Sequence, residues 1–179
     1  MSFLNFLTKN YKNKLDIIIF IDKNQCWYHK GIDSITNNID ETVEYLKKKI
    51  YTRNEIDSKL YKKYKKIIFM GVSAGGYASI LFGSLCNIDN VISFIPRTKL
   101  INPIDKKYED LNNFINKDVN YLLIGDLSEK NKNSNHYISQ CTRLDKYNNI
   151  YINKFDNLNL KKLRDNGTLN NLIDNILNN

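Results

Sequence analysis

The stretch KIIFMGVSAGGYASILFGSLC, residues 66–86, decides the fold class of this chain. The run IIFM near its start is apolar, as is typical of a strand buried in a parallel sheet. Glycines and small residues follow, and from Ala74 onward apolar residues recur at the spacing of a buried helix. A strand that turns tightly into a helix is the basic unit of an α/β fold.

The rest of the chain repeats this alternation of strand and helix. Apolar runs predict four further strands, at residues 15–21 (LDIIIFI), 90–95, 121–124 and 150–152. Further helical patterns occupy residues 40–50, about 135–146, and 158–178 with a break at Gly167. We therefore predict a single compact α/β domain over residues 1–179, with about five mainly parallel strands, helices on both faces and no large lid.

Charge and composition limit the expected partners. The formal net charge is +8, and the densest basic runs are residues 47–49 and 61–66. The first run ends a helical pattern, where cations suit the helix C-terminus, and the second leads into a strand. Arginine, which is preferred for reading bases and phosphates, is scarce, so nucleic-acid binding is not expected.

Cysteine spacing and hydropathy indicate the compartment. Cys26, Cys86 and Cys141 lie far apart without metal-ligand spacing, which predicts neither a disulfide framework nor a zinc site. No secretion signal is evident, and no apolar run approaches the roughly 20 residues that span a bilayer. A cytoplasmic protein without membrane association is expected.

Gly71, Ser73 and Gly75 match the pattern GxSxG between the strand and the helix. In a nucleophile elbow this pattern holds the serine in strained backbone angles, so that its hydroxyl stands above the sheet edge. The positions two before and two after the serine must be small, because strand and helix pass close together there. We therefore expect a positive φ at Ser73 and steric intolerance at both glycines.

Two other interpretations of this turn follow from its sequence. It is compatible with a glycine-rich structural turn that carries an incidental serine. A dinucleotide-binding loop fits poorly, because GxGxxG is not matched and Tyr77 stands where a further glycine would help. The next strand also runs into Pro96 and Arg97, not into an acidic residue.

Three segments of the chain resemble a known family. GVSAGGYASILFGSLCNIDNVISFIPRT (residues 71–98) is similar to the elbow, helix and next strand of small serine hydrolase-like domains of the α/β-hydrolase superfamily, of the type encoded with polysaccharide biosynthesis genes. FIDKNQCWYHKGIDSITNNIDETVEYLKK (residues 20–48) resembles their first strand and loop, and LKKLRDNGTLNNLIDNIL (residues 160–177) their closing helix. The resemblance implies a compact α/β-hydrolase-like fold.

The resemblance also implies roles for particular residues. In these folds an acid and then a histidine follow the nucleophile in chain order. Ser73 is the nucleophile, and Asp126, directly after the apolar run YLLIG, is the candidate acid, although GlyAsp is equally suited to a simple turn. One oxyanion donor is expected to be the backbone N–H of Ala74, and the other to come from the loop near Asp22 and Lys23.

The general base is where the chain departs from the family. The resemblance places a histidine within residues 155–160, but this window holds Asn157 and Asn159, and asparagine cannot accept the serine proton. His136 and His29 are the only histidines. His136 is the first candidate, since it follows Asp126 in chain order, and His29 the second; either is also compatible with an ordinary surface histidine.

Two functions therefore remain open. The first is a serine hydrolase of the esterase or acyl transferase type that acts on a small-molecule ester or acyl-sugar. The second is a catalytically inactive relative that keeps the fold for binding or for a structural role. Neither requires a cofactor or a metal ion. The sequence defines neither the substrate nor an oligomeric state.

Overall fold

The structure, a computed structural model, describes residues 3–53 and 60–178. The chain forms two compact units, one from Asp22 to Asn157 and one from the segments Met1–Ile21 and Leu158–Asn179. The larger unit contains every residue of the predicted catalytic set. Its sheet and its connections are therefore the part of the fold that positions the site.

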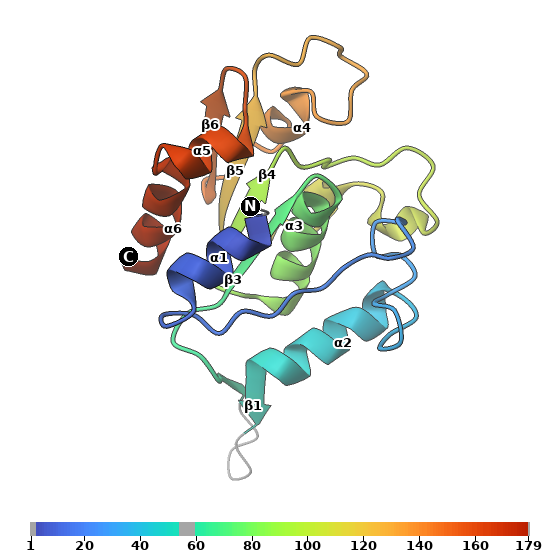
Figure 1. Cartoon of the computed structure of the whole chain (residues 1–179). Helices are drawn as coiled ribbons and strands as arrows, with labels where there is room; N and C mark the ends of the chain where they lie inside the picture. Colours follow the sequence, from blue (N-terminus) through green and yellow to red (C-terminus); the bar gives the residue numbers. More distant parts are fainter. Residues whose placement is uncertain (1–2, 54–59, 179) are drawn as a thin grey trace. The chain divides into compact units, whose positions relative to one another are not determined.

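Four parallel strands form the sheet of the larger unit (Figure 1). They lie in the order of the chain: β3 (Ile68–Val72), β4 (Asn90–Phe94), β5 (Asn120–Asp126) and β6 (Ile150–Phe155). Each corresponds to an apolar run in the sequence. The fold is thus mixed α/β, as predicted, with four strands in the described sheet where about five were expected.

Helices connect these strands. α3 (Ala74–Cys86) joins β3 to β4 and packs on both, and α4 (Ser139–Thr142) lies between β5 and β6 and packs on β5. Two short 3-10 helices, η1 (Lys106–Tyr108) and η2 (Leu111–Asn113), lie between β4 and β5.

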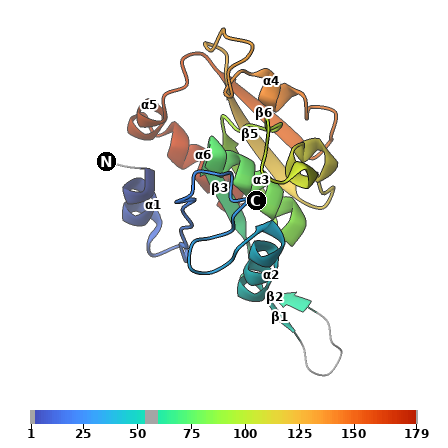
Figure 2. The same cartoon turned by 90° about the vertical axis from the view of Figure 1, so that its right-hand side faces the viewer.

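α3 is the central helix, and α2 (Ile39–Ile50) packs against it (Figure 2). α3 is apolar on every side, with Tyr77, Ile80 and Leu81 fully buried, which is typical of a helix covered all round. α2 begins at an N-cap, where the Asn38 side chain accepts a hydrogen bond from the backbone N–H of Glu41. A two-stranded antiparallel sheet follows, formed by β1 (Tyr51–Arg53) and β2 (Leu60–Lys62).

The predicted strand at residues 15–21 is wrong, because the segment is irregular. Ile18 is 59% exposed and Ile21 65% exposed. An apolar, β-branched run favours a strand only where a neighbouring strand takes up its backbone hydrogen bonds. The hydrophobic pattern alone therefore predicted a strand where the chain forms no regular secondary structure.

The smaller unit is helical. It contains α1 (Phe3–Tyr11), α5 (Leu160–Asp165) and α6 (Thr168–Asn178). The predicted break at Gly167 is confirmed, since this glycine has φ +81° between α5 and α6. None of the helices in the described residues is long and apolar enough to cross a membrane.

Candidate active site

Ser73 occupies the sharp turn between β3 and α3. Its φ of 55° and ψ of −112° lie outside the regions that non-glycine residues usually adopt, so the predicted positive φ is confirmed. The turn is held at both ends, because the backbone N–H of Ser73 donates to the carbonyl of Phe94 in β4 and its own carbonyl accepts from Tyr77 in α3. The strain is thus maintained by the surrounding backbone.

Two glycines make this turn possible. They are Gly71 and Gly76, whereas Gly71 and Gly75 were predicted. A Cβ at Gly71 would overlap the carbonyl of Gly75, so only glycine fits there, as expected. A Cβ at Gly75 would meet nothing within 4 Å, so the predicted intolerance at Gly75 is wrong. The second close approach is at Gly76, where a Cβ would lie 2.7 Å from the Ser93 hydroxyl of β4.

The Ser73 hydroxyl is bonded to a histidine. A serine at the N-cap of a helix usually accepts a hydrogen bond from the first-turn backbone, yet Ser73 makes no such side-chain cap. Its Oγ instead lies 2.8 Å from Nε2 of His136, and both residues are partly buried. A hydroxyl and an imidazole at this separation can exchange a proton.

The loop after β5 places His136. Asp126, the last residue of β5, forms a parallel bridge with Tyr137, which brings the neighbouring histidine to the carboxyl edge of the sheet. The backbone N–H of His136 donates to the Ser134 hydroxyl at 3.2 Å. The helix predicted from about residue 135 begins only at Ser139. His136 therefore precedes the helix and is not carried on its surface.

Two carboxylates belong to the chain segment that leads to this histidine. Oδ1 of Asp126, the predicted acid, accepts hydrogen bonds from the backbone and the hydroxyl of Ser128. Glu129, which the sequence reasoning missed, accepts from the backbone of Asn131 and the hydroxyl of Ser134, and these bonds lower its pKa. His136 lowers the pKa of Glu129 further through its charge. Ser73 is the only hydrogen-bond partner of the His136 ring among the described residues.

His29, the second candidate base, has a structural environment. It is 5% exposed, and Nδ1 accepts a hydrogen bond from the backbone N–H of Asp105. Nε2 must then carry the proton and donates to the hydroxyl of Tyr77, which donates in turn to the carbonyl of Tyr108. Burial lowers the pKa of His29. The described contacts thus hold it as a neutral imidazole inside the fold.

The predicted oxyanion donors differ in how well they are placed. Ala74 is the first residue of α3 and follows Ser73 directly, so its backbone N–H is at the positive end of a 13-residue helix. The Lys23 side chain is exposed and pairs with Asp33 at 2.9 Å. Among the described residues no contact joins Lys23 to Ser73, so its role stays a prediction.

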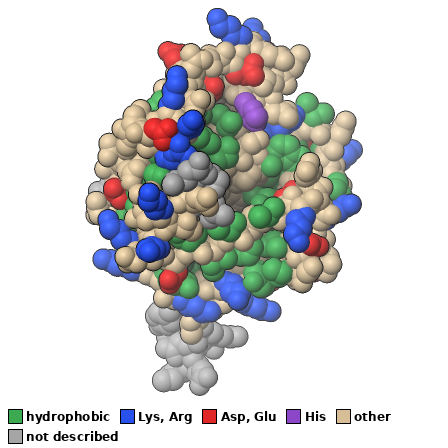
Figure 3. Space-filling view, viewed as in Figure 1, with side chains coloured by type: hydrophobic (Ala, Val, Ile, Leu, Met, Phe, Trp, Pro, Cys, Tyr) green, Lys and Arg blue, Asp and Glu red, His purple; other side chains and the backbone are tan. Residues whose placement is uncertain are grey.

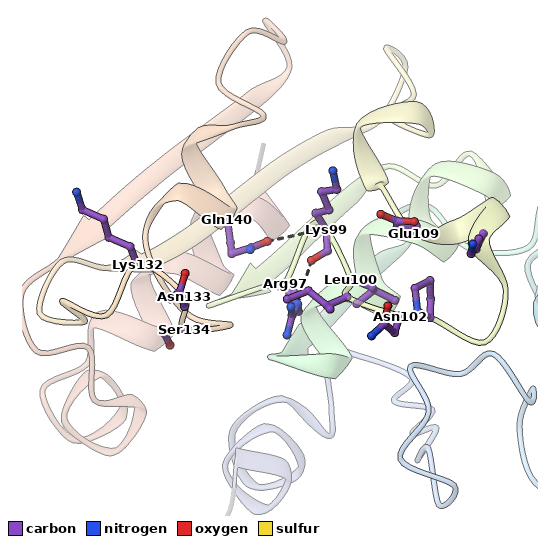
Figure 4. A pocket seen from close by; sticks show the side chains of 12 residues that line it. Arg97, Lys99, Leu100, Asn102, Glu109, Lys132, Asn133, Ser134 and Gln140 are labelled. Atoms are coloured by element: carbon purple, nitrogen blue, oxygen red, sulfur yellow. Dashed lines mark hydrogen bonds between the residues drawn. The ribbon is translucent and has the colours of Figure 1, made fainter.

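A pocket of about 550 Å³ opens beside residues 127–136, the histidine loop that follows β5 (Figure 4). Its two walls follow β4 and β5, with Arg97 and Asn102 on one side and Lys132, Asn133 and Ser134 on the other.

Within the described ranges no group of three or more His, Cys, Asp or Glu side chains is arranged to hold a metal ion. Elsewhere, Lys and Arg side chains are spread among acidic ones and do not gather in one patch on the face drawn in Figure 3.

No family model, curated protein or solved structure matches the chain. The function of the chain is therefore inferred from the arrangement of Ser73, His136 and the residues around them.

Proposed function

We propose that the protein is a serine hydrolase of the esterase or acyl transferase type, acting on an ester or acyl-sugar, with Ser73 as nucleophile and His136 as general base. The hydrogen bond of 2.8 Å between Ser73 Oγ and His136 Nε2 carries the proposal. A free serine is a weak nucleophile at neutral pH, and an adjacent imidazole is the usual means of activating it. A compact α/β-hydrolase-like fold is part of the same proposal.

The conformation of Ser73 supports this role. A positive φ at a non-glycine residue costs on the order of 1–3 kcal/mol, and the contacts of the turn must supply that free energy. A structural serine at a helix N-cap would recover part of it by capping the first turn, but Ser73 has no such cap. The strain and the missing cap are both explained if the hydroxyl serves the reaction.

The reaction follows from the positions of these groups. Ser73 Oγ attacks the ester carbonyl carbon while its proton passes to Nε2 of His136, so the other ring nitrogen must carry the proton of the resting imidazole. The carbonyl oxygen gains the negative charge, and the backbone N–H of Ala74 stabilises it. His136 then returns the proton to the leaving alcohol, which departs as the carbonyl re-forms.

The second half of the reaction releases the acyl group. Water, or the hydroxyl of an acceptor sugar, attacks the acyl-serine while Nε2 of His136 takes its proton. Collapse of the intermediate returns that proton to Ser73 Oγ. Hydrolase and transferase chemistry thus use the same two side chains and differ in the attacking hydroxyl.

We assign Asp126 as the acid that orients His136, with Glu129 as the competing carboxylate. Asp126 ends the strand that carries the histidine loop, and its backbone pairs with Tyr137. Glu129 accepts from the hydroxyl of Ser134, which in turn accepts the backbone N–H of His136. Asp126→Asn and Glu129→Gln are the variants that separate them: the larger fall in kcat identifies the orienting acid.

Hydrolysis of p-nitrophenyl butyrate and labelling by a fluorophosphonate test the proposal. Ser73→Ala should abolish labelling, and both Ser73→Ala and His136→Ala should lower kcat/KM by about a thousandfold or more. Ser139→Ala, which removes an exposed hydroxyl at the start of α4, three residues after His136, is the matched control and should retain the parent rate.

His29→Gln tests the alternative base. It should stay within a few-fold of the parent, because His29 is bonded to Asp105 and Tyr77. Folded parent protein that neither turns over the ester nor reacts with the label would refute the proposal and favour a non-catalytic, binding role. Equal rates for the parent and Ser73→Ala would also refute it.

A further inference from the structure

The pocket beside the histidine loop shares residues with the segments that hold the proposed catalytic pair. Ser134 lines it and accepts the backbone N–H of His136. Arg97 lines the opposite wall, three residues after Phe94, whose carbonyl accepts the backbone N–H of Ser73. Both walls follow the carboxyl ends of parallel strands, where ligands of open α/β sheets bind.

The charged residues in the lining of this pocket are mainly basic. Its charged residues are four bases and one acid: Arg97, Lys99, Lys106, Lys132 and Glu109. Clefts with an excess of one charge concentrate ligands of the opposite charge. The pocket is therefore suited to an anion.

Arg97 is the most buried of these basic residues. Three arginine side chains are described, and two of them pair with carboxylates: Arg143 with Asp110 and Arg164 with Asp165. Arg97 is 7% exposed and has no carboxylate partner among the described residues. Burial lowers its pKa. The side chain is largely buried, but its two terminal nitrogens are not sealed from solvent, so an anion that enters the pocket can reach them.

The guanidinium is also held in place. Its Nε donates to the carbonyl of Lys99 at 2.9 Å, and its Cζ lies 6.0 Å from the ring centroid of Trp27. Nε is the only nitrogen of this group with a hydrogen bond to another described residue. The two terminal nitrogens form the planar fork that binds carboxylate or phosphate oxygens in pairs.

We propose that this pocket binds an anionic group of the substrate, a carboxylate or a phosphate, through Arg97, so that the enzyme selects acyl esters that carry a negative charge. The naming of a substrate class rests on the proposed function. The binding of an anion at Arg97 does not depend on the proposed function, and it can be measured without turnover.

Calorimetric titration with inorganic phosphate and with succinate tests the binding. Trp27 is the only tryptophan of the chain, so its fluorescence reports whether the anion binds beside Arg97. We expect saturable binding of at least one anion, which Arg97→Gln weakens about 10-fold or more. The anion bound more tightly identifies the substrate group. Lys117→Gln, which removes an exposed charge before β5, should leave the affinity unchanged.

Two esters test the link to catalysis. Mono-p-nitrophenyl succinate carries a carboxylate, and p-nitrophenyl butyrate is its neutral counterpart. In Arg97→Gln the ratio of kcat/KM for the charged ester to that for the neutral ester should fall about 10-fold or more, through KM of the charged ester.

The outcomes separate this inference from the proposed function. If anions bind through Arg97 but neither ester is hydrolysed, the proposed function fails and the anion site stands. If the esters are hydrolysed but neither anion binds saturably, or Arg97→Gln binds as the parent does, the inference fails and the proposed function stands. An unchanged ratio of kcat/KM in Arg97→Gln would also overturn the claim of selectivity.

Discussion

The three glycines of the serine turn should differ sharply in their tolerance of one added methyl group. In Gly71→Ala the new Cβ overlaps the carbonyl of Gly75 and lies 2.8 Å from the backbone nitrogen of Gly76. Both obstacles are backbone, so the first turn of α3 must shift away from β3. Overpacking against movable side chains costs about 1–3 kcal/mol, and we expect at least about 3 kcal/mol here.

Gly75→Ala is the matched control, because it adds the same methyl group to open space. Alanine is favoured over glycine in a helix by up to about 1 kcal/mol, so this variant should be neutral or slightly stabilised. Gly76→Ala should fall between the two. Its Cβ would meet the Ser93 hydroxyl, which can rotate away if it gives up its hydrogen bond to the Gly76 carbonyl. It would also lie 3.1 Å from the carbonyl oxygen of Phe94 and 3.2 Å from Cα of Pro96, which are backbone atoms. We expect a cost of about 1–3 kcal/mol.

Urea unfolding measures these differences directly. With a slope of about 2 kcal/mol per molar urea, Gly71→Ala and Gly75→Ala should differ in midpoint by about 1.5 M or more. Ser93→Ala should recover part of the loss in Gly76→Ala but none of that in Gly71→Ala. Equal midpoints for Gly71→Ala and Gly75→Ala would refute the close approach of strand and helix at the Ser73 turn.

Three further predictions concern the surroundings of the site. Burial lowers the pKa of His29 in the folded chain. The neutral imidazole therefore stabilises the fold fully above the pKa of an unfolded histidine, near 6.5, and this stabilisation is lost as the pH falls. The free energy of unfolding should thus differ less between pH 5 and pH 7 in His29→Gln than in the parent. Arg143→Gln should cost about 1–3 kcal/mol in urea unfolding, because it breaks a two-pronged, half-buried pair with Asp110; an unchanged midpoint would contradict this. Thr98→Val should lower the unfolding free energy by about 1–2 kcal/mol, because it removes the buried hydroxyl that bonds Gln140, whereas Thr98→Ser should recover most of that loss.

The elements that sequence reasoning placed correctly are those with strong local signals. α3 begins at Ala74 and ends at Cys86, as its apolar spacing predicts, and β3 to β6 coincide with apolar runs. Residues 15–21 carry an equally strong apolar signal and are irregular. The difference is that a strand also needs hydrogen-bond partners, and no local pattern reports whether a distant segment supplies them.

The candidate site was predictable in its residue types but not in its contacts. Ser73 lies in the motif GxSxG, and because the chain has two histidines there are only two candidates for the general base. Only the folded chain distinguishes them, because it buries His29 against Tyr77 and brings His136 to Ser73 across 63 residues of sequence. Arg97 gave a weaker signal: it follows the end of a predicted strand, where ligand-binding residues often lie.

The position of the proposed base follows from the order of the strands. Neighbouring strands lie about 4.8 Å apart, so the ends of β3 and β5 are separated by about 10 Å, with β4 between them. The ten-residue loop from Asp126 to His136 is long enough to cross this distance, and the pairing of Asp126 with Tyr137 returns it to the sheet edge. A histidine after β6 would start about 5 Å farther from Ser73. Asn157 in the expected histidine window is therefore compatible with catalysis, because the loop after β5 already brings an imidazole to the serine.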